Sequence, residues 1–273
     1  MKKMITIIAL ILLFPIIPKA DIVVKYQTDA EMANGMLLKT ESIYNIKGAR
    51  NFCEIKTNFS MTNVPGTPFD IISAYIICLD KGVRCTPKSA DKTYEEENLI
   101  SLHGLDSTKQ GDEYLWAIEI SPINDKKEIR KFQCTGQIGK AIGVNRNDAI
   151  DTVFITYVQW STEYFPLAAE LIAYQENYAR SVGVNKLWSQ EQLATLLEKG
   201  YGSCFEQLSD TMNSTGFIPI MSNIIIERTF KTDTGSPKTM KAVIGIIKNE
   251  LASIKEKKLK DKMFEIPSNY KKE

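Results

Sequence analysis

The spacing of apolar and polar residues predicts β-strands through the first half of the chain. Between residues 51 and 61 the two kinds of side chain alternate, so that Cys53 and Ile55 share a face opposite Glu54. This period of two is typical of a strand that is buried on one side. Residues 71–79 are almost uninterruptedly apolar, and we expect them to form the central strand. Further strands are predicted at residues 22–26, 83–86, 92–96, 114–120, 131–138 and 152–161.

The period changes after Pro166, where apolar residues begin to recur at the spacing of one helical face. This pattern predicts an amphipathic helix over residues 167–182, and Gly183 is a natural end for it. The residues that form its apolar stripe are Leu167, Leu171, Tyr174, Tyr178 and Val182.

Two more helices are predicted from the residues that would begin them. Ser189 and Gln192 have the spacing of a capping box, which predicts a helix over residues 189–200. Ser203 and Glu206 repeat this spacing and predict a shorter helix after it.

Strand character returns at residues 218–229. Residues 240–254 are ambiguous, because Val243, Ile247 and Leu251 fit a helical face while the β-branched content fits a strand. Strands followed by helices and then by strands again indicate a single α+β domain.

The first twenty residues have the pattern of a secretory signal. Lys2 and Lys3 precede an apolar stretch at residues 4–17, which is shorter than the roughly 20 residues that a membrane span needs. We expect cleavage after Ala20, which leaves residues 21–273 as one β-rich domain in the periplasm or the medium. No cysteine follows the cleavage region, and no later segment is apolar enough to span a membrane.

The charge and the missing motifs exclude several functions. Lys+Arg number 34 and Asp+Glu number 33, so the chain has no basic excess with which to bind nucleic acid. The single histidine, His103, is predicted to lie in a loop, and no nucleophile motif, phosphate-binding loop or zinc spacing is present. We therefore expect no catalytic residues, no metal and no cofactor. Two groups of glycines do not have the spacing of a dinucleotide-binding loop, and we interpret them as turns. They are Gly136, Gly139 and Gly143, and Gly200 and Gly202.

The chain has five cysteines, so not all of them can pair internally. Cys78 and Cys85 flank a predicted hairpin turn, and a disulfide between them is one possibility, while buried free thiols are the other. If Lys81 and Gly82 form a two-residue loop, the two cysteines lie opposite each other. If Gly82 forms a bulge instead, the register shifts by one and they point to different faces.

Three aromatic residues near the predicted sheet and helices have two interpretations. Trp116, Trp160 and Tyr164 could belong to the core or could line a cavity between sheet and helices. The core is favoured, because large aromatic side chains usually fill it and pockets are few in any protein.

Several short motifs, in this order, resemble an exported bacterial family, domain-of-unknown-function family 4412. They are Tyr44-Asn45-Ile46-Lys47-Gly48, Leu79-Asp80-Lys81-Gly82, Asp91-Lys92-Thr93-Tyr94, Trp160-Ser161-Thr162-Glu163 and Phe264-Glu265-Ile266-Pro267-Ser268-Asn269-Tyr270-Lys271. The chain departs from the family's pattern around Lys131 and at Ile218.

That family is similar to the periplasmic lipoprotein-carrier proteins LolA and LolB. The resemblance implies an α+β fold, in which a curved antiparallel sheet forms an incomplete barrel with two to three helices packed over one face. It also implies that residues 240–254 form a strand, and it supplies no active-site residues.

The function expected from the sequence is therefore non-enzymatic binding in the cell envelope. A cavity between the sheet and the helix at 167–182 would hold a lipid or a lipoprotein acyl chain. The alternative is an envelope interaction protein that has a solid core and works through its surface or a sheet edge. A hydrolase without a recognisable motif is the least favoured reading.

Overall fold

The computed structural model describes residues 20–62, 64, 68–102, 113–163, 165–182, 201–212, 217–231 and 239–273. Within these residues, twelve strands form one sheet, in which all neighbours are antiparallel except the short terminal pair β12 and β6. The strands are β1 (Ile22–Met32), β2 (Met36–Lys47), β3 (Arg50–Met61), β4 (Pro68–Cys78), β5 (Val83–Lys88), β6 (Thr93–Asn98), β7 (Tyr114–Ile129), β8 (Phe132–Asn145), β9 (Thr152–Thr162), β10 (Ile218–Lys231), β11 (Thr239–Glu256) and β12 (Lys271–Lys272). The described helices are α1 (Leu99–Leu102), α2 (Ala168–Val182) and α4 (Gly202–Met212), with 3-10 turns η1 (Leu79–Lys81) and η4 (Asp261–Phe264).

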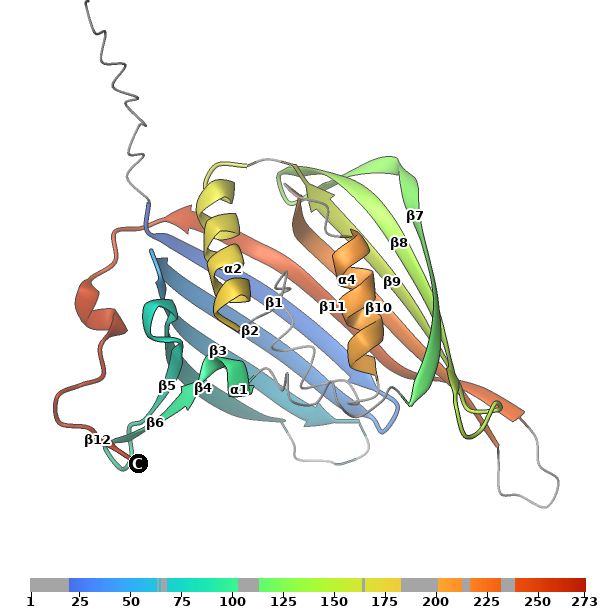
Figure 1. Ribbon diagram of the computed structural model, residues 1–273, viewed down its shortest axis with the longest axis horizontal. Coiled ribbons are helices and arrows are strands. Elements are labelled where there is room, and N and C mark those ends of the chain that lie inside the picture. Colours follow the sequence, from blue (N-terminus) through green and yellow to red (C-terminus); the bar gives the residue numbers. More distant parts are fainter. Residues whose placement is uncertain are drawn as a thin grey trace, which may run out of the picture.

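Two meanders make up the sheet. Strands β1 to β6 follow one another in space as they do in the chain, and β7 to β11 do the same. The meanders join where β1 pairs with β11, for example at Tyr26 opposite Leu251. The result is an open, curved sheet whose two ends do not pair with each other (Figure 1).

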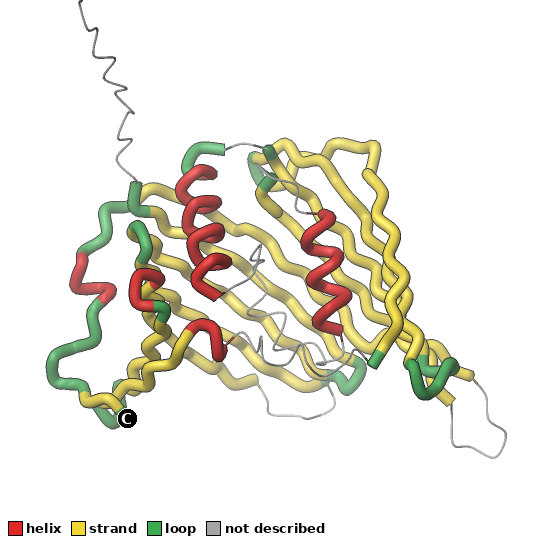
Figure 2. Tube along the Cα trace, in the orientation of Figure 1, coloured by secondary structure: helices red, strands yellow, loops and turns green. Residues whose placement is uncertain are grey.

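Helices α2 and α4 lie across the same face of this sheet (Figure 2). We call it the inner face and the opposite one the outer face. The prediction of a curved, mostly antiparallel sheet with few helices is confirmed, and so is the strand over residues 240–254. The predicted helix at 189–200 lies outside the described residues.

The prediction that residues 71–79 form the central strand is wrong. β4 is fourth from one end of the sheet, and only Ile76, Ile77 and Cys78 pair with β5. A continuous apolar run predicts a strand that is buried on both faces, but this strand is buried on both faces only near its end. Ile76 and Ile77 are 4% and 1% exposed, whereas Ile72 is 76% exposed.

The interpretation of Gly136, Gly139 and Gly143 as turns is also wrong, because all three lie inside β8. Each allows a close approach. A Cβ on Gly139 would lie 2.7 Å from Cδ2 of Leu208 in α4, and one on Gly143 would lie 2.6 Å from the ring of Trp116. A glycine inside a strand often marks such a contact, so these residues make room for the core.

The segment after β11 runs along the left side of the sheet in Figure 1, and we call residues 257–273 the C-terminal strap. Leu259 and Phe264 of the strap are buried against outer-face side chains that include Val23 and Ile76. The strap ends as β12, which pairs in parallel with β6. The final motif of the sequence therefore covers a second, smaller core on the outer face.

Hydrogen bonds also attach the strap to the rest of the protein: Lys257 N to Asp21 O (3.0 Å), Lys47 Nζ to Leu259 O (3.0 Å), Arg50 Nη2 to Asp261 Oδ1 (2.6 Å) and Lys271 N to Lys92 O (3.0 Å).

Candidate functional site

The inner face is built from rows of side chains that lie side by side on successive strands. One apolar row crosses nine strands, because the register places its members directly opposite each other. We call it the apolar row: Ile120, Gly139, Tyr157, Ile224, Ile247, Ala30, Leu38, Phe59 and Phe69.

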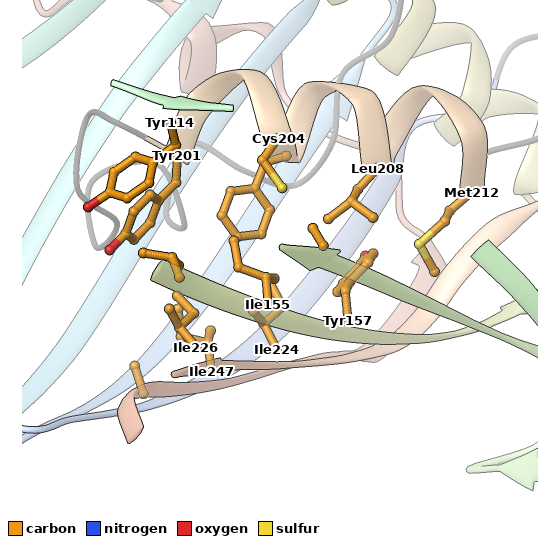
Figure 3. Close-up of a cluster of buried hydrophobic side chains, with 14 residues drawn as sticks. Tyr114, Ile155, Tyr157, Tyr201, Cys204, Leu208, Met212, Ile224, Ile226 and Ile247 are labelled. Carbon is orange, nitrogen blue, oxygen red and sulfur yellow. The ribbon is translucent and has the colours of Figure 1, made fainter. Parts of the chain in front are cut away.

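Helix α4 covers one part of the apolar row. Leu208 and Met212 of α4 are each 1% exposed and belong to one buried cluster with Tyr157 and Ile224 of the sheet (Figure 3). Tyr201 lies at the start of the helix and contacts the ring of Trp116 edge-on, with centroids 6.0 Å apart. This part of the inner face is a packed core.

The apolar row continues beyond this core, onto strands where its side chains are more exposed. We call six inner-face apolar residues on the adjoining ends of β2, β3 and β4 the apolar sector: Met36, Leu38, Phe59, Met61, Phe69 and Ile71. Phe69 is 48% exposed and Ile71 is 50% exposed, while the other four are half-buried. The rings of Phe59 and Phe69 are in contact, with centroids 4.8 Å apart. Exposed apolar side chains that form one continuous surface commonly mark a place where something binds.

Next to the apolar row runs a row of polar side chains. We call it the polar row: Gln137, Gln159, Ser222, Asn249, Thr28, Thr40 and Thr57. Many of its side chains are buried, and their polar groups form hydrogen bonds within the protein. Thr28 donates to Asn249 Oδ1 at 2.9 Å, and Tyr157 donates to Gln159 Oε1 at 2.8 Å. Burial raises the pKa of the Tyr157 hydroxyl, and a hydrogen bond with Ser222 lowers it. Burial has the larger effect, so the pKa lies well above its usual value.

Ion pairs lie at both ends of the inner face. At one end Arg228 donates two hydrogen bonds to Asp151, at 2.7 and 2.9 Å. At the other end Arg84 donates to Glu97 at 2.8 Å. Among the described residues, the inner-face rows of β1 to β4 contain no charged side chain between these two pairs.

The Arg228–Asp151 pair makes part of the fold's stability depend on pH. The hydrogen bonds from Arg228 are the largest cause that lowers the pKa of Asp151, with further bonds from Asn145 and Tyr114. A carboxylate whose pKa is lower in the folded state stabilises the fold above its unfolded pKa of about 3.9. That contribution is lost as the pH falls through the lower, folded-state pKa.

We therefore expect Arg228→Gln to reduce the free energy of unfolding at pH 7 by about 2 kcal/mol, the scale of a charged hydrogen bond. The difference from the parent protein should shrink as the pH falls below about 4. Urea denaturation at pH 7 and pH 3 measures both effects. Lys56→Gln, which removes an exposed ion pair with Asp70, is the control and should change little at either pH. An equal loss from Arg228→Gln at both pH values would contradict this account.

Helix α2 is packed onto the sheet where the sequence analysis expected a cavity. Leu171 is 3% exposed and clusters with Ile22, Val24 and Leu251 of the sheet. Tyr178 and Val182, about two and three turns further on, form another buried cluster with strands β3 and β4. The apolar stripe of α2 is therefore core. The half-buried and exposed side chains of the apolar sector lie on β2 to β4 instead.

The aromatic residues singled out in the sequence are found at the margins of these clusters. Trp116 packs over Gly143 beside the cluster under α4, and Trp160 packs beside the cluster under α2. The core interpretation therefore fits both residues. Tyr164 and His103 lie outside the described residues.

Cys78 and Cys85 lie on the outer face beneath the C-terminal strap, and both are free thiols in the structure. Their register matches neither alternative that the sequence left open. Cys78 pairs with Val83 and Cys85 pairs with Ile76, because η1 extends the turn and Gly82 adopts a left-handed conformation (φ 65°). The two cysteines share a face but are diagonal neighbours. Burial is the largest cause that raises the pKa of both thiols.

This register argues against the disulfide that the sequence left open. Diagonal neighbours across an antiparallel pair lie about 7–8 Å apart, whereas the Cβ atoms of a disulfide are about 3.8 Å apart. We expect non-reducing peptide mapping to find Cys78 and Cys85 as free thiols. Recovery of a peptide in which they are bridged would mean that the hairpin adopts the two-residue loop instead.

No group of three or more histidine, cysteine or acidic side chains in the described residues is placed to hold a metal ion. No helix in the same residues is both long and apolar enough to cross a membrane.

The sequence signals for the site were partial. Alternation placed Phe59 and Met61 on the buried face of β3, but nothing in the sequence marked the apolar sector as exposed. Its exposure depends on where α2 and α4 lie. The predicted signal segment at residues 1–20 falls almost entirely outside the described residues.

No family model matches this chain, so membership of family 4412 stays a prediction. No curated protein matches it either. Among solved structures, a LolA superfamily protein from Nitrosomonas europaea is 9% identical over 91% of each chain, with a TM-score of 0.28. A protein of domain-of-unknown-function family 1329 from Desulfovibrio piger is 10% identical over 90% of each chain, with a TM-score of 0.18.

Proposed function

We propose that this protein binds an acyl chain or a similar apolar ligand on the inner face of its sheet. It would act without catalysis, as a binding or carrier protein of the cell envelope. The predicted export signal supports the location, and the absence of a recognisable catalytic motif in the sequence supports a binding role.

The observation that carries this proposal is the apolar sector. Its side chains extend the buried apolar row away from α4, yet Phe69 and Ile71 are about half exposed. Two of the six sector residues are methionines, Met36 and Met61, which face each other across β2 and β3. Methionine adapts to ligands of different shape, which suits a surface for flexible chains. An acyl chain that covered the sector would gain about 0.8 kcal/mol for each methylene removed from water.

Thermal unfolding in the presence of a lipid tests this proposal. At a free ligand concentration 100 times the Kd, binding should stabilise the protein by about 2.7 kcal/mol. For a domain of this size each kcal/mol raises the Tm by about 2–4 °C, so the shift is large enough to measure. Myristate and 1-myristoylglycerol, below their aggregation concentrations, are suitable probes.

Neighbouring residues on β4 provide a matched pair of variants. Ile71 points to the inner face and Ile72 to the outer face, and both are exposed enough to accept a polar residue. We expect Ile71→Arg to abolish the lipid-induced shift, and Ile72→Arg to retain it. If neither lipid shifts the Tm of the parent protein, or if both variants respond like the parent, the proposal is wrong.

The interaction alternative also has an observation in its favour. Along β4, residues 68–75 pair with β3 on one side and have no partner strand on the other side within the described residues. Such an edge can accept a strand from another protein. On this alternative, Ile72→Arg should disturb the protein's associations more than Ile71→Arg, and added lipid should not stabilise it.

A further inference from the structure

We propose that the ligand is an uncharged amphiphile, such as an acyl ester of glycerol, whose polar group binds at Thr40 and Thr57. This inference rests on the proposed function and deepens it, because it names the chemistry of the ligand. Two features of the inner face carry it: a lack of charge and one hydroxyl pair beside the apolar sector.

The first feature is electrostatic. On the first meander the charged residues of β1 to β4 point outward, and several pair with each other there. Lys25 pairs with Glu41, and Lys56 pairs with Asp70, all on the outer face. The inner-face rows at the same level contain only apolar and uncharged polar side chains. A carboxylate or phosphate buried there would lose its hydration and find no cation in return.

The second feature is the end of the polar row. Its deeper members, including Thr28 and Asn249, are buried and bonded to each other. Thr40 and Thr57 are less buried, and their hydroxyl oxygens lie 3.1 Å apart. In such a pair one hydroxyl donates and the other accepts, which leaves the proton of the accepting hydroxyl for a further acceptor. A carbonyl oxygen of an ester or an amide would fit that donor.

The spacing of the rows matches the shape of such a ligand. Thr40 and Leu38 lie two residues apart on β2, as do Thr57 and Phe59 on β3, so their side chains are about 7 Å apart on the same face. The hydroxyl pair therefore borders the apolar sector directly. A chain that lay on Leu38 and Phe59 would bring the carbonyl at its head to the hydroxyl pair.

The experiment compares two probes that share one acyl chain. We expect isothermal titration at pH 8 to give a Kd for 1-myristoylglycerol at least tenfold lower than that for myristate. The double variant T40V/T57V removes both hydroxyls at nearly constant volume and should weaken binding of the glycerol ester at least fivefold. Its effect on myristate should be smaller. Thr156→Val is the control, because Thr156 lies on the outer face of β9 opposite Lys140 and Ile225.

Each outcome has one meaning. If neither probe binds, the proposed function fails and this inference fails with it. If myristate binds as tightly as the ester, the proposed function stands and the inference is overturned. The inference is also overturned if T40V/T57V, shown to be folded by its unfolding transition, binds the ester as the parent does. A tenfold preference for the ester that the double variant loses and Thr156→Val keeps would support it.

Discussion

Replacing Phe264 by alanine should destabilise the protein by about 3–5 kcal/mol, the usual cost of removing a buried aromatic side chain. Phe264 is 4% exposed and lies in the core between the C-terminal strap and the outer face, with Val23 and Ile76 as neighbours. Arg50 also lies over its ring, 5.2 Å from the centroid. The loss of the ring therefore removes both packing and a cation–π contact.

Chemical denaturation measures this effect, and Phe230→Ala provides the comparison. Phe230 is 39% exposed and lies near the end of β10, so its replacement should cost much less. If the two variants lose the same stability, the strap contributes little to the fold.

The second large effect is expected from Leu171→Ala, which should reduce the free energy of unfolding by about 2–5 kcal/mol. Leu171 is 3% exposed at the centre of the contact between α2 and the sheet. If the space beneath α2 were instead a ligand cavity, the same change would cost little in the free protein. It would then reduce lipid binding rather than stability.

Denaturation of the free protein together with lipid titration separates these two possibilities. Leu115→Ala is the control, because Leu115 is 56% exposed on β7. If the free energy of unfolding of Leu171→Ala lies within about 0.5 kcal/mol of the parent value, the ligand cavity lies beneath α2, as the sequence predicted.

The sequence predicted best those elements whose period is set by one buried face. β3 alternates because Cys53 is buried on the inner face while Glu54 and Lys56 are exposed on the outer face, and α2 has a single apolar stripe. β2 escaped prediction because Lys39, Thr40, Glu41 and Ser42 are polar on both faces, although Ser42 is fully buried. A strand of this kind becomes visible only when its neighbours are known.

The candidate site could not be predicted from the sequence for a related reason. The polar row takes one residue from each strand, and Gln159, Ser222 and Thr28 are far apart along the chain. Register brings them together, and register depends on turns and bulges that single residues do not specify. The turn after Cys78 illustrates this, because a 3-10 turn gives a pairing that differs from both alternatives that the residues left open.

The seam between β1 and β11 has a consequence for the order in which the protein folds. Within each meander the strands pair with their neighbours in the chain, and most of those contacts close short loops, although α2 and α4 separate β9 from β10. The seam instead joins Ile22 to Glu256, almost the two ends of the described chain. Loop-closure entropy makes such a distant pairing slow to form, and it raises the contact order of the whole fold. During synthesis β1 must therefore wait, with one edge unpaired, until β11 has been added.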